Sequence, residues 1–376
     1  MKIIISKKRL ELAVKNICRV INKKNVLPIL DDILCIVDDP KKRLTLTGSD
    51  GEVWLNYQIN LDDCDGSGTF CVDATILKKA LAELKDQPLT IDIYKTIDKM
   101  ELKHETGTTQ LPTIDAGEYP TQTLHNDMAI EWTLDSAMLK RVIKRTVDFV
   151  ADDELRPIMC GVLFDQTKDA LNIVASDGHI LIRNAEQMDN HVGSFIMPKK
   201  VARLIPKVID GTEDVKVMFG DRLASFEQGA VTMVFRIIDG KYPKYMNVIP
   251  KNQPHHLRTD RQRMLLAMRN VANFTMTKSQ LVKLAINSDQ SMILYGEDLD
   301  ISAAANDRIT IEYPEAHQMN IGVKADNTIK ILSMIQELEI DIHFADPSHA
   351  ITIIPVDPIY DGEELTVLIM PMILND

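Results

Sequence analysis

Apolar residues return at helical spacing in three stretches of the chain. Positions i, i+3, i+4 and i+7 are apolar within residues 10–21, 138–147 and 264–271, which predicts amphipathic helices with one buried face. A second pattern, an apolar strand that runs directly into a helix, occurs at residues 68–84, 193–209 and 319–338. Between these helices, apolar and polar residues alternate as they do in half-buried strands. The pattern predicts helix, strands, helix and strands, three times in succession.

The three copies of this pattern lie at a nearly constant spacing. Val72 and Met197 are 125 residues apart, and Met197 and Val323 are 126 residues apart. Units of this length are large enough to hold their own cores, unlike the short repeats that stack into solenoids. We therefore expect an α+β protein with three tandem domains, at residues 1–125, 126–252 and 253–376.

Two of the turns between strands carry an Asp-Gly pair, Asp50-Gly51 and Asp177-Gly178. Glycine accepts the positive φ that such hairpin turns require, so an aspartate that recurs at equivalent positions is typical of a turn. Ser176 and His179 flank the second pair, but residues this close in sequence rarely reach the geometry of a catalytic triad. The sequence also lacks a phosphate-binding glycine loop. An enzyme is the less favoured alternative, and we expect no catalytic residue and no cofactor.

The cysteine spacing and the length of the apolar stretches argue against a metal site and against a membrane protein. The five cysteines form no CxxC pair, and none lies beside a histidine at the spacing of metal ligands, so we expect reduced thiols and no metal site. No stretch approaches the roughly 18 to 20 apolar residues that cross a bilayer, and the apolar opening is too short for a signal peptide. These features favour a cytoplasmic protein without a membrane partner.

The charged residues are distributed unevenly along the chain, so the net charge does not describe every surface of the protein. The chain carries −12 in total, but the six expected helical windows carry +18, which leaves −30 for the strands and loops. Lysine and arginine are good helix formers, yet glutamate is equally good and is scarce in these windows. We expect a helical face that binds a polyanion, because lysine and arginine bind phosphates without regard to sequence. With 5% aromatic residues and no zinc-finger spacing, duplex DNA is favoured over single strands.

Several short segments resemble the bacterial DNA polymerase III β sliding clamp family, and the resemblance covers the whole chain. Their order and spacing on the threefold repeat make the resemblance specific. The matching segments are Leu27-Pro28-Ile29-Leu30, Arg156-Pro157-Ile158-Met159-Cys160-Gly161-Val162-Leu163-Phe164, Val174-Ala175-Ser176-Asp177-Gly178-His179, Ile238-Asp239-Gly240-Lys241-Tyr242-Pro243-Lys244-Tyr245, Val248-Ile249-Pro250-Lys251 and Met370-Pro371-Met372.

The resemblance implies a ring that confers processivity on the replicative polymerase. A head-to-tail homodimer would encircle duplex DNA, with helices lining the hole and sheets outside. Phe274 matches an apolar interface position and is expected to meet Ile76 and Leu77 of a second subunit. Residues expected to contact DNA are Lys24, Lys144, Arg145, Lys200 and Arg203. The alternative is an interaction scaffold of the same fold that does not encircle DNA; its helices would be neutral, whereas these are basic.

The family also has a groove that binds linear peptides of the polymerase III catalytic subunit, the clamp loader, other polymerases and repair proteins. Matched residue by residue, the groove here would comprise Met159, Ser176, Gly178, His179, Leu181, Pro243, Val248, Ala350, Leu368, Ile369, Met370, Pro371 and Met372. Ile180 and Ile373 stand where the family often has arginine, so we expect a less basic rim. Such an apolar cleft suits leucine and aromatic anchors.

Overall fold

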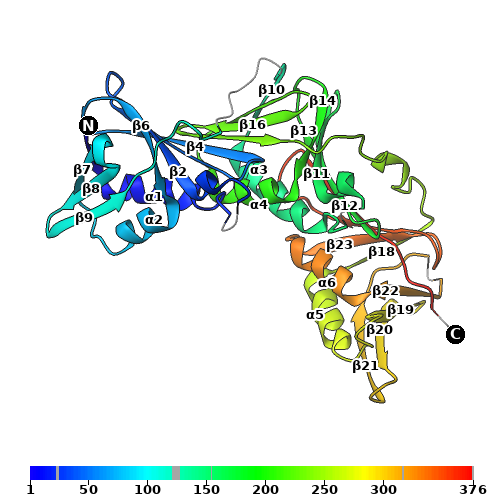
Figure 1. The fold of residues 1–376 in the computed structure, drawn as a ribbon. Coiled ribbons are helices and arrows are strands. Elements are labelled where there is room, and N and C mark those ends of the chain that lie inside the picture. The colour runs from blue at the N-terminus through cyan, green and yellow to red at the C-terminus, as the bar shows by residue number, and fades with distance from the viewer. Residues whose placement is uncertain (23–24, 121–127, 154, 316, 375–376) are drawn as a thin grey trace. The chain divides into compact units, whose positions relative to one another are not determined.

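Two compact α+β units make up the computed structural model of the chain (Figure 1), which describes residues 1–376 except 23–24, 121–127, 154, 316 and 375–376. The first unit contains Met1–Arg141 and Lys200–Asp239, and the second contains Val142–Lys199 and Gly240–Asp376. Lys24 and the expected domain boundary at residues 125–126 lie outside the described residues. The three-domain division therefore stays a prediction, because each compact unit includes part of the central segment.

The first unit holds a five-stranded sheet, β5-β1-β7-β8-β9, and an eight-stranded sheet, β10-β15-β16-β17-β4-β3-β2-β6. The bounds of its strands are β1 Lys2–Ser6, β2 Asp32–Asp38, β3 Arg43–Ser49, β4 Val53–Asn60, β5 Asp63–Asp65, β6 Gly68–Asp73, β7 Pro88–Tyr94, β8 Lys99–His104, β9 Gly107–Pro112, β10 Ile130–Leu134, β15 Val215–Phe219, β16 Leu223–Gln228 and β17 Val231–Arg236. Its helices are α1 Lys7–Ile17, α2 Ala74–Ala82 and α4 Lys199–Val208, with 3-10 turns at Pro28–Asp31 and Lys95–Ile97.

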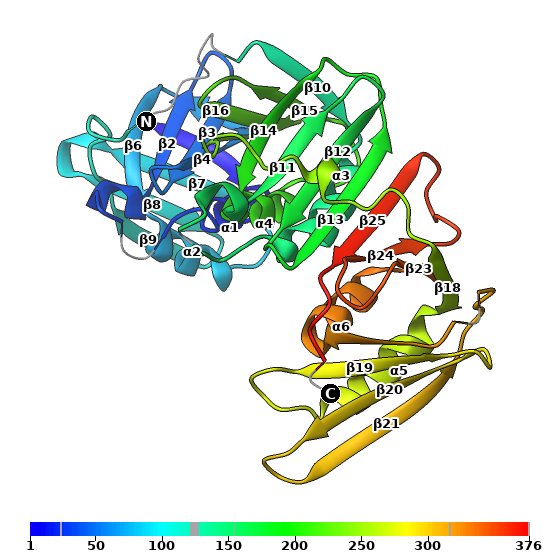
Figure 2. The same cartoon turned by 90° about the vertical axis from the view of Figure 1, so that its right-hand side faces the viewer.

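The second unit also holds two sheets, β14-β11-β12-β13-β25-β24-β23-β18 and β21-β20-β19-β22 (Figure 2). Its strands are β11 Gly161–Gln166, β12 Ala170–Ser176, β13 Ile180–Gln187, β14 Gly193–Pro198, β18 His255–Asp260, β19 Leu281–Asn287, β20 Ser291–Asp298, β21 Ala303–Thr310, β22 Met319–Lys324, β23 Glu339–Phe344, β24 Ile351–Pro355 and β25 Glu363–Ile369. Its helices are α5 Arg261–Ala272 and α6 Ala325–Met334, with 3-10 turns at Val147–Phe149, Pro157–Cys160 and Tyr245–Asn247. Helix α3, Ser136–Thr146, is divided between the units.

Helices cover one face of the sheets because their apolar stripes and the alternating strands share one core. Helix α1 packs on β3, β4 and α2, and α5 packs on α6, β20 and β21 (Figure 1). On α1, Leu10, Val14 and Ile17 are buried while Lys8 and Lys15 are exposed. The helical period thus places apolar side chains on the sheet and basic side chains on the solvent face.

Three helices begin with an aspartate that caps free main-chain amides. Asp73 accepts a hydrogen bond from Ile76 N at 2.7 Å, and Asp260 accepts one from Arg263 N at 2.6 Å. Asp135 does the same for Met138 N at 2.6 Å. An N-cap of this kind satisfies one of the unpaired amides in the first helical turn, which explains the abrupt change from strand to helix.

One strand order recurs three times along the chain. The sets β6-β2-β3-β4, β14-β11-β12-β13 and β22-β19-β20-β21 have the same sequence of neighbours. In the first unit β4 pairs with β17, and in the second unit β13 pairs with β25. The equivalent strand β21 stands at the edge of its sheet, as does β9, the last strand of the first copy. Among the edge strands, β9 and β21 therefore lack the partners that their equivalents in the other copies have.

No helix in the described part of the chain is long and apolar enough to cross a membrane. The described residues also contain no group of three or more histidine, cysteine and acidic side chains that could hold a metal ion. All five cysteines are free thiols, with Cys35 and Cys71 buried.

Candidate peptide-binding site and basic helices

The turn between β12 and β13 is held by its own side chains. Asp177 Oδ1 accepts hydrogen bonds from His179 N and Ile180 N, both at 2.8 Å. Ser176 Oγ donates to Ile180 O at 2.7 Å and accepts from Gly178 N at 3.1 Å. Gly178 has φ +93°, a conformation that glycine adopts without strain. Asp177 and Ser176 are thus occupied in shaping a hairpin that exposes His179.

The C-terminal segment runs along this hairpin. Leu181 lies directly opposite Leu368 in the β13–β25 pairing. Beyond the strand, Met370 N donates to His179 O at 2.8 Å, and Met372 N donates to Gly322 O at 2.8 Å. The structure therefore brings the His179 turn and the 368–372 tail together, as the sequence predicts.

The alternation of strand side chains corrects two of the expected positions. Leu181 and Leu368 share one face of the sheet, and Ile180 and Ile369, which also pair, share the other. All four side chains are buried, with exposures of 1% for Ile180, 2% for Ile369 and 4% for each of the two leucines, so the face of the sheet and not the burial distinguishes the two pairs. Ile369 therefore does not line the expected groove, and Ile180 is no rim residue, whereas Ile373 is exposed.

The segment after the central copy carries Pro243 and Val248, which are expected to form the opposite wall of the groove. Burial raises the pKa of Tyr242, whose hydroxyl has no hydrogen-bond partner among the described residues. Tyr245 donates from its hydroxyl to Asp165 Oδ2 at 2.7 Å. These two anchors fix the segment that carries Pro243 and Val248, and the Val248 side chain is 57% exposed.

The remaining expected residues differ in their hydrogen bonds and exposure. Gln253 Nε2 donates to Ala350 O at 2.8 Å, which ties the segment after Val248 to the start of β24. Met159 O accepts from Ala151 N at 3.0 Å, and its side chain is partly exposed. Pro371 and Met372 are partly exposed, and Met370 is exposed. Apolar surface accessible to a ligand is thus present at both walls.

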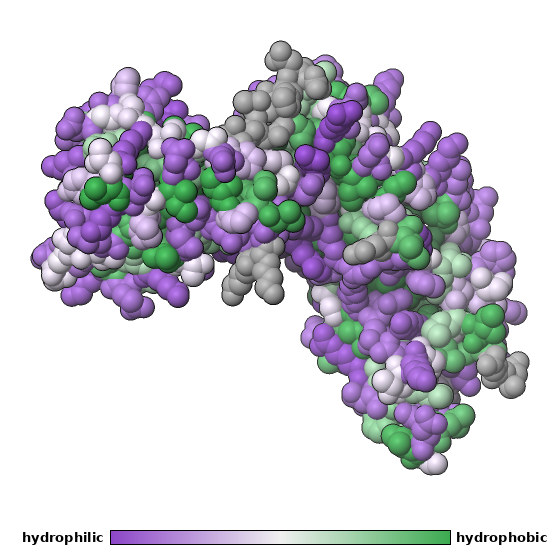
Figure 3. Space-filling view, viewed as in Figure 1, coloured by the Kyte–Doolittle hydropathy of each residue, from purple (hydrophilic) through white to green (hydrophobic). Residues whose placement is uncertain are grey.

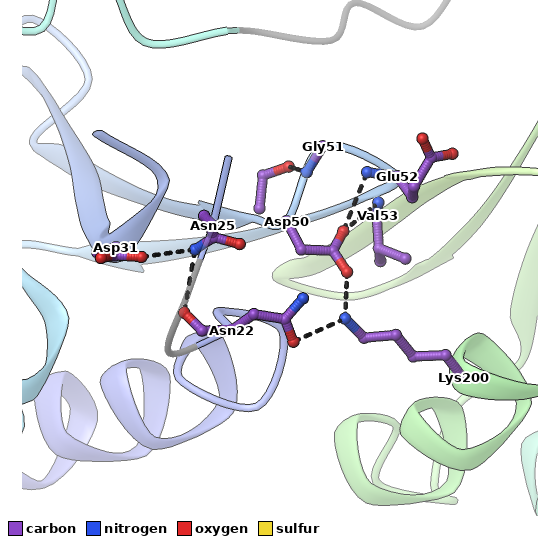
Figure 4. A network of polar contacts seen from close by, with 9 residues as sticks. Asn22, Asn25, Asp31, Asp50, Gly51, Glu52, Val53 and Lys200 are labelled. Carbon is purple, nitrogen blue, oxygen red and sulfur yellow. Dashed lines mark hydrogen bonds and ion pairs between the residues drawn. The ribbon is translucent and has the colours of Figure 1, made fainter. Parts of the chain in front are cut away.

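Lys200 projects from α4 to the first Asp-Gly turn (Figure 4). Its ammonium group forms an ion pair with Asp50 and donates to Asn22 Oδ1 at 3.2 Å. Asp50 also accepts from Glu52 N and Val53 N, at 3.0 and 2.9 Å. Lys200 remains exposed, and so do Lys144 and Arg203 on their helices. These three side chains keep a positive charge at the helical surface.

Arg145 does not belong to that surface, and its expected role in DNA contact is wrong. The residue is 4% exposed, and its guanidinium forms an ion pair with Glu363. Nη2 lies 3.7 Å from Glu337 Oε1, and Nε and Nη2 have no hydrogen-bond partner among the described residues. The charge summed over a helical stretch of sequence does not show whether an arginine is exposed or is buried against acidic residues from a distant part of the chain.

Because breaking a buried ion pair leaves an uncompensated charge, Arg145→Met is expected to lower the free energy of unfolding by about 3–5 kcal/mol. Chemical denaturation measures this change. Combining Arg145→Met with Glu337→Gln and Glu363→Gln should recover much of the loss, since no buried charge is then unpaired. A single variant as stable as the parent would contradict the buried pair.

The expected interface residues differ in their accessibility. Phe274 is 37% exposed just after α5, and Ile76 is exposed on α2. Leu77, in contrast, is 2% exposed and packs inside its own unit, so it cannot meet a second subunit directly. Leu299 and Ile301 are not among the residues expected from the sequence, yet both are exposed in the turn between β20 and β21, where Figure 3 shows hydrophobic surface. The sequence signal that could have identified them is the presence of two apolar residues in a polar turn, between Asp298 and Ser302.

Comparisons with known proteins agree with this geometry. The model of the DNA polymerase III beta subunit N-terminal domain matches residues 1–124, and that of the central domain of the same subunit matches residues 133–244. The beta sliding clamp of Pseudomonas putida is 26% identical over 333 residues, covering 87% of this chain and 88% of the relative. That of Caulobacter vibrioides is 25% identical over 369 residues, covering 95% and 97%. The crystal structure of the DNA polymerase III subunit beta from Pseudomonas aeruginosa superposes with a TM-score of 0.91 at 22% identity, covering both chains completely.

The fold, the basic helices and these matches define a DNA sliding clamp, a non-catalytic processivity factor rather than an enzyme. The matched domains together span more than half of the chain, and the chain belongs to the bacterial DNA polymerase III beta subunit family. DNA and a DNA polymerase are accordingly its general partners.

Proposed function

We propose that two copies of the chain join head to tail into a ring around duplex DNA. The observation that supports this proposal is that the edge strands β9 and β21 lack the partners their equivalents in the repeat have. The last strands of the second and third copies, β17 and β25, pair with β4 and β13. In the first copy the last strand is β9, and in the third copy the strand equivalent to β4 and β13 is β21. A pairing of β9 with β21 would repeat the pattern, but both are edge strands within one chain. A second chain can supply each missing partner, and two such contacts close a ring.

Side chains at the existing junctions indicate what the junction between subunits contains. In the second unit, Lys330 Nζ lies 4.5 Å from the ring centroid of Phe149. Phe274 follows Phe149 by 125 residues, the repeat spacing, and Lys79 holds the place in the first copy that Lys330 holds in the third. We therefore expect Lys79 of one subunit to lie over Phe274 of the other.

A second contact follows from the Asp50–Lys200 pair. Leu299 comes directly after β20, as Asp50 comes after β3, and Lys200 corresponds to Thr75, which adjoins Ile76. The polar pair within one chain would thus be replaced between subunits by apolar contact of Leu299 and Ile301 with Ile76. Burial of exposed apolar side chains of this size supports association.

Helical lysines and arginines would hold the DNA without reading its sequence. Lys144, Lys200 and Arg203 keep charge at the surface, and phosphate contacts of this kind weaken steeply with salt. The absence of base-reading contacts would let the ring slide. A scaffold of the same fold that avoids DNA is less well supported, because it gives no reason for the +18 on the helical windows.

The triple variant Lys144→Glu, Lys200→Gln, Arg203→Glu is expected to lose retention on nicked circular DNA about tenfold at moderate salt. Lys200 is changed to glutamine because a glutamate would face Asp50. Lys41→Glu, Lys95→Gln, Lys168→Glu is the matched control, since it removes the same charge from exposed turns outside the helices. Gel filtration of loaded circles measures retention. Equal retention of the two variants, or parental retention that is the same at 50 and 300 mM salt, roughly the range in which such contacts screen out, would contradict a basic pore.

The groove between the His179 turn, the 243–248 segment and the 368–372 tail would bind linear peptides. Exposed Val248 and Met370 and partly exposed Met159 offer apolar contact to leucine or phenylalanine anchors. The polymerase III catalytic subunit, the clamp loader, other polymerases and repair proteins would bring such peptides in turn. The chain would act in the cytoplasm, where the bacterial chromosome lies.

A further inference from the structure

A hollow of about 530 Å³ lies in the second unit beside the expected groove. It is lined by side chains of β23, β24 and β25 and by the segment 249–254. The lining residues are Ile249, Pro250, Lys251, Asn252, Gln253, Pro254, His343, Thr352, Ile354 and Thr366. None of the thirteen groove positions expected from the sequence is among them.

The hollow continues the surface that carries the groove. Thr352 lies directly opposite Leu368 in the β24–β25 pairing and opposite His343 in the β23–β24 pairing. Thr366 and Leu368 alternate on β25 and therefore face the same side of the sheet. On the other wall, Val248 immediately precedes Ile249. A peptide bound against the exposed Val248 side chain would thus reach the hollow with its next few residues.

Several polar groups of the hollow can donate a hydrogen bond, while Gln253, whose amide NH2 is bound to Ala350 O, adds an acceptor oxygen. Thr352 is 3% exposed, and its Oγ1 has no hydrogen-bond partner among the described residues. A buried hydroxyl without a partner costs free energy, so a ligand that pairs with it is favoured. Thr366 adds a second hydroxyl, Asn252 an amide and Lys251 an ammonium group, and no carboxylate is among the lining residues that the structure describes.

His343 adds a polar group without adding charge. Burial lowers the pKa of this imidazole, while Asp341 opposes that shift in part. The ring stacks on His256 with centroids 5.8 Å apart, and His256 Nδ1 lies 2.9 Å from Glu315 Oε1. Near neutral pH the hollow therefore contains one cation, Lys251, and neutral donors, with aliphatic walls at Ile249, Pro250 and Ile354.

We propose that this hollow is a second pocket of the peptide site and that it accepts an acidic side chain, aspartate or glutamate, flanking the apolar anchors. The inference rests on the proposed function of the groove. An aliphatic stem suits the walls, and a carboxylate is the group that hydroxyl, amide and ammonium donors bind together.

A set of fluorescein-labelled peptides tests the pocket. Each carries one leucine and one phenylalanine anchor and alanine flanks, and a single glutamate is moved through each flanking position on both sides. Fluorescence polarisation gives the Kd of each peptide for the full-length protein. At one position, glutamate is expected to tighten binding about fivefold over alanine, and Lys251→Met and Thr352→Val should each remove most of that gain. Lys168→Met, which changes an exposed lysine in the β11–β12 turn, outside both the hollow and the groove, should leave the gain intact.

Comparison of the two kinds of peptide separates the pocket from the groove. The alanine-flanked peptide should bind Lys251→Met and Thr352→Val as it binds the parent, and should lose binding to Val248→Asp. If glutamate gives no gain at any position, or if the gain survives both pocket variants, the pocket is wrong while the groove stands. If the alanine-flanked peptide does not bind the parent, the groove fails and the pocket inference falls with it.

Discussion

Removal of residues 370–376 is expected to abolish peptide binding and stimulation of DNA polymerase III while the dimer persists. Met370 and Met372 are tied to the His179 turn and to Gly322 by main-chain hydrogen bonds, so the deletion removes one wall of the groove. Each apolar anchor of a bound peptide contributes roughly 1.5–3 kcal/mol when fully buried, part of which offsets the ordering of the ligand. Micromolar affinity is the expected starting point, and fluorescence polarisation would record its loss.

The same tail also packs on the third copy, so the deletion requires a control for folding. A Cβ at Gly322 would lie 2.4 Å from Met372 O, a distance that shows how closely the tail follows β22. The double variant Val248→Ser, Met370→Ser changes only side chains that are already exposed and should leave the melting temperature unchanged. It should nevertheless weaken peptide binding at least tenfold, by roughly the loss of two apolar contacts. A folded deletion variant that still stimulates the polymerase would place the partner site elsewhere.

Phe274→Arg is expected to convert the dimer into monomers. The ring is partly exposed in one chain and corresponds to Phe149, whose equivalent contact with Lys330 is formed within the chain. Arginine at this position would bring a second cation against Lys79 of the other subunit and would remove apolar area from both junctions of the ring. Sedimentation velocity at micromolar concentration measures the change.

Two further variants show whether loss of the dimer is specific. The control variant Val192→Arg changes an exposed apolar residue in the loop before β14. This loop is distant in sequence from β9, β21 and α2, so the variant protein should remain dimeric. Leu299→Ser should weaken the dimer by a smaller amount, since it removes one of the two apolar residues in the β20–β21 turn. If the Phe274→Arg protein is still a dimer, Phe274 does not belong to the interface. Other apolar side chains would then have to stabilise a pairing of β9 with β21.

The sequence by itself determined the features that depend on neighbours along the chain. Helical spacing on α1, α3 and α5 predicted their buried faces, and the constant spacing of Val72, Met197 and Val323 revealed the repeat. The Asp-Gly turns were predictable because glycine favours the positive φ found at Gly51 and Gly178. The short motifs around Ser176 and Met370 identified the family, since their order is read directly from the chain.

The tertiary structure decided which side chains these elements make available. Arg145 lies in a basic helix whose sequence suggests a surface residue. In the structure it is buried and forms an ion pair with Glu363, more than two hundred residues away in the chain. Ile369 adjoins Leu368, yet the register with Ile180 turns it to the opposite face. The open edges β9 and β21 and the hollow under residues 249–254 depend on strand partners that no local pattern specifies. Local periodicity determines which face of an element is buried, whereas long-range pairing determines what that face meets.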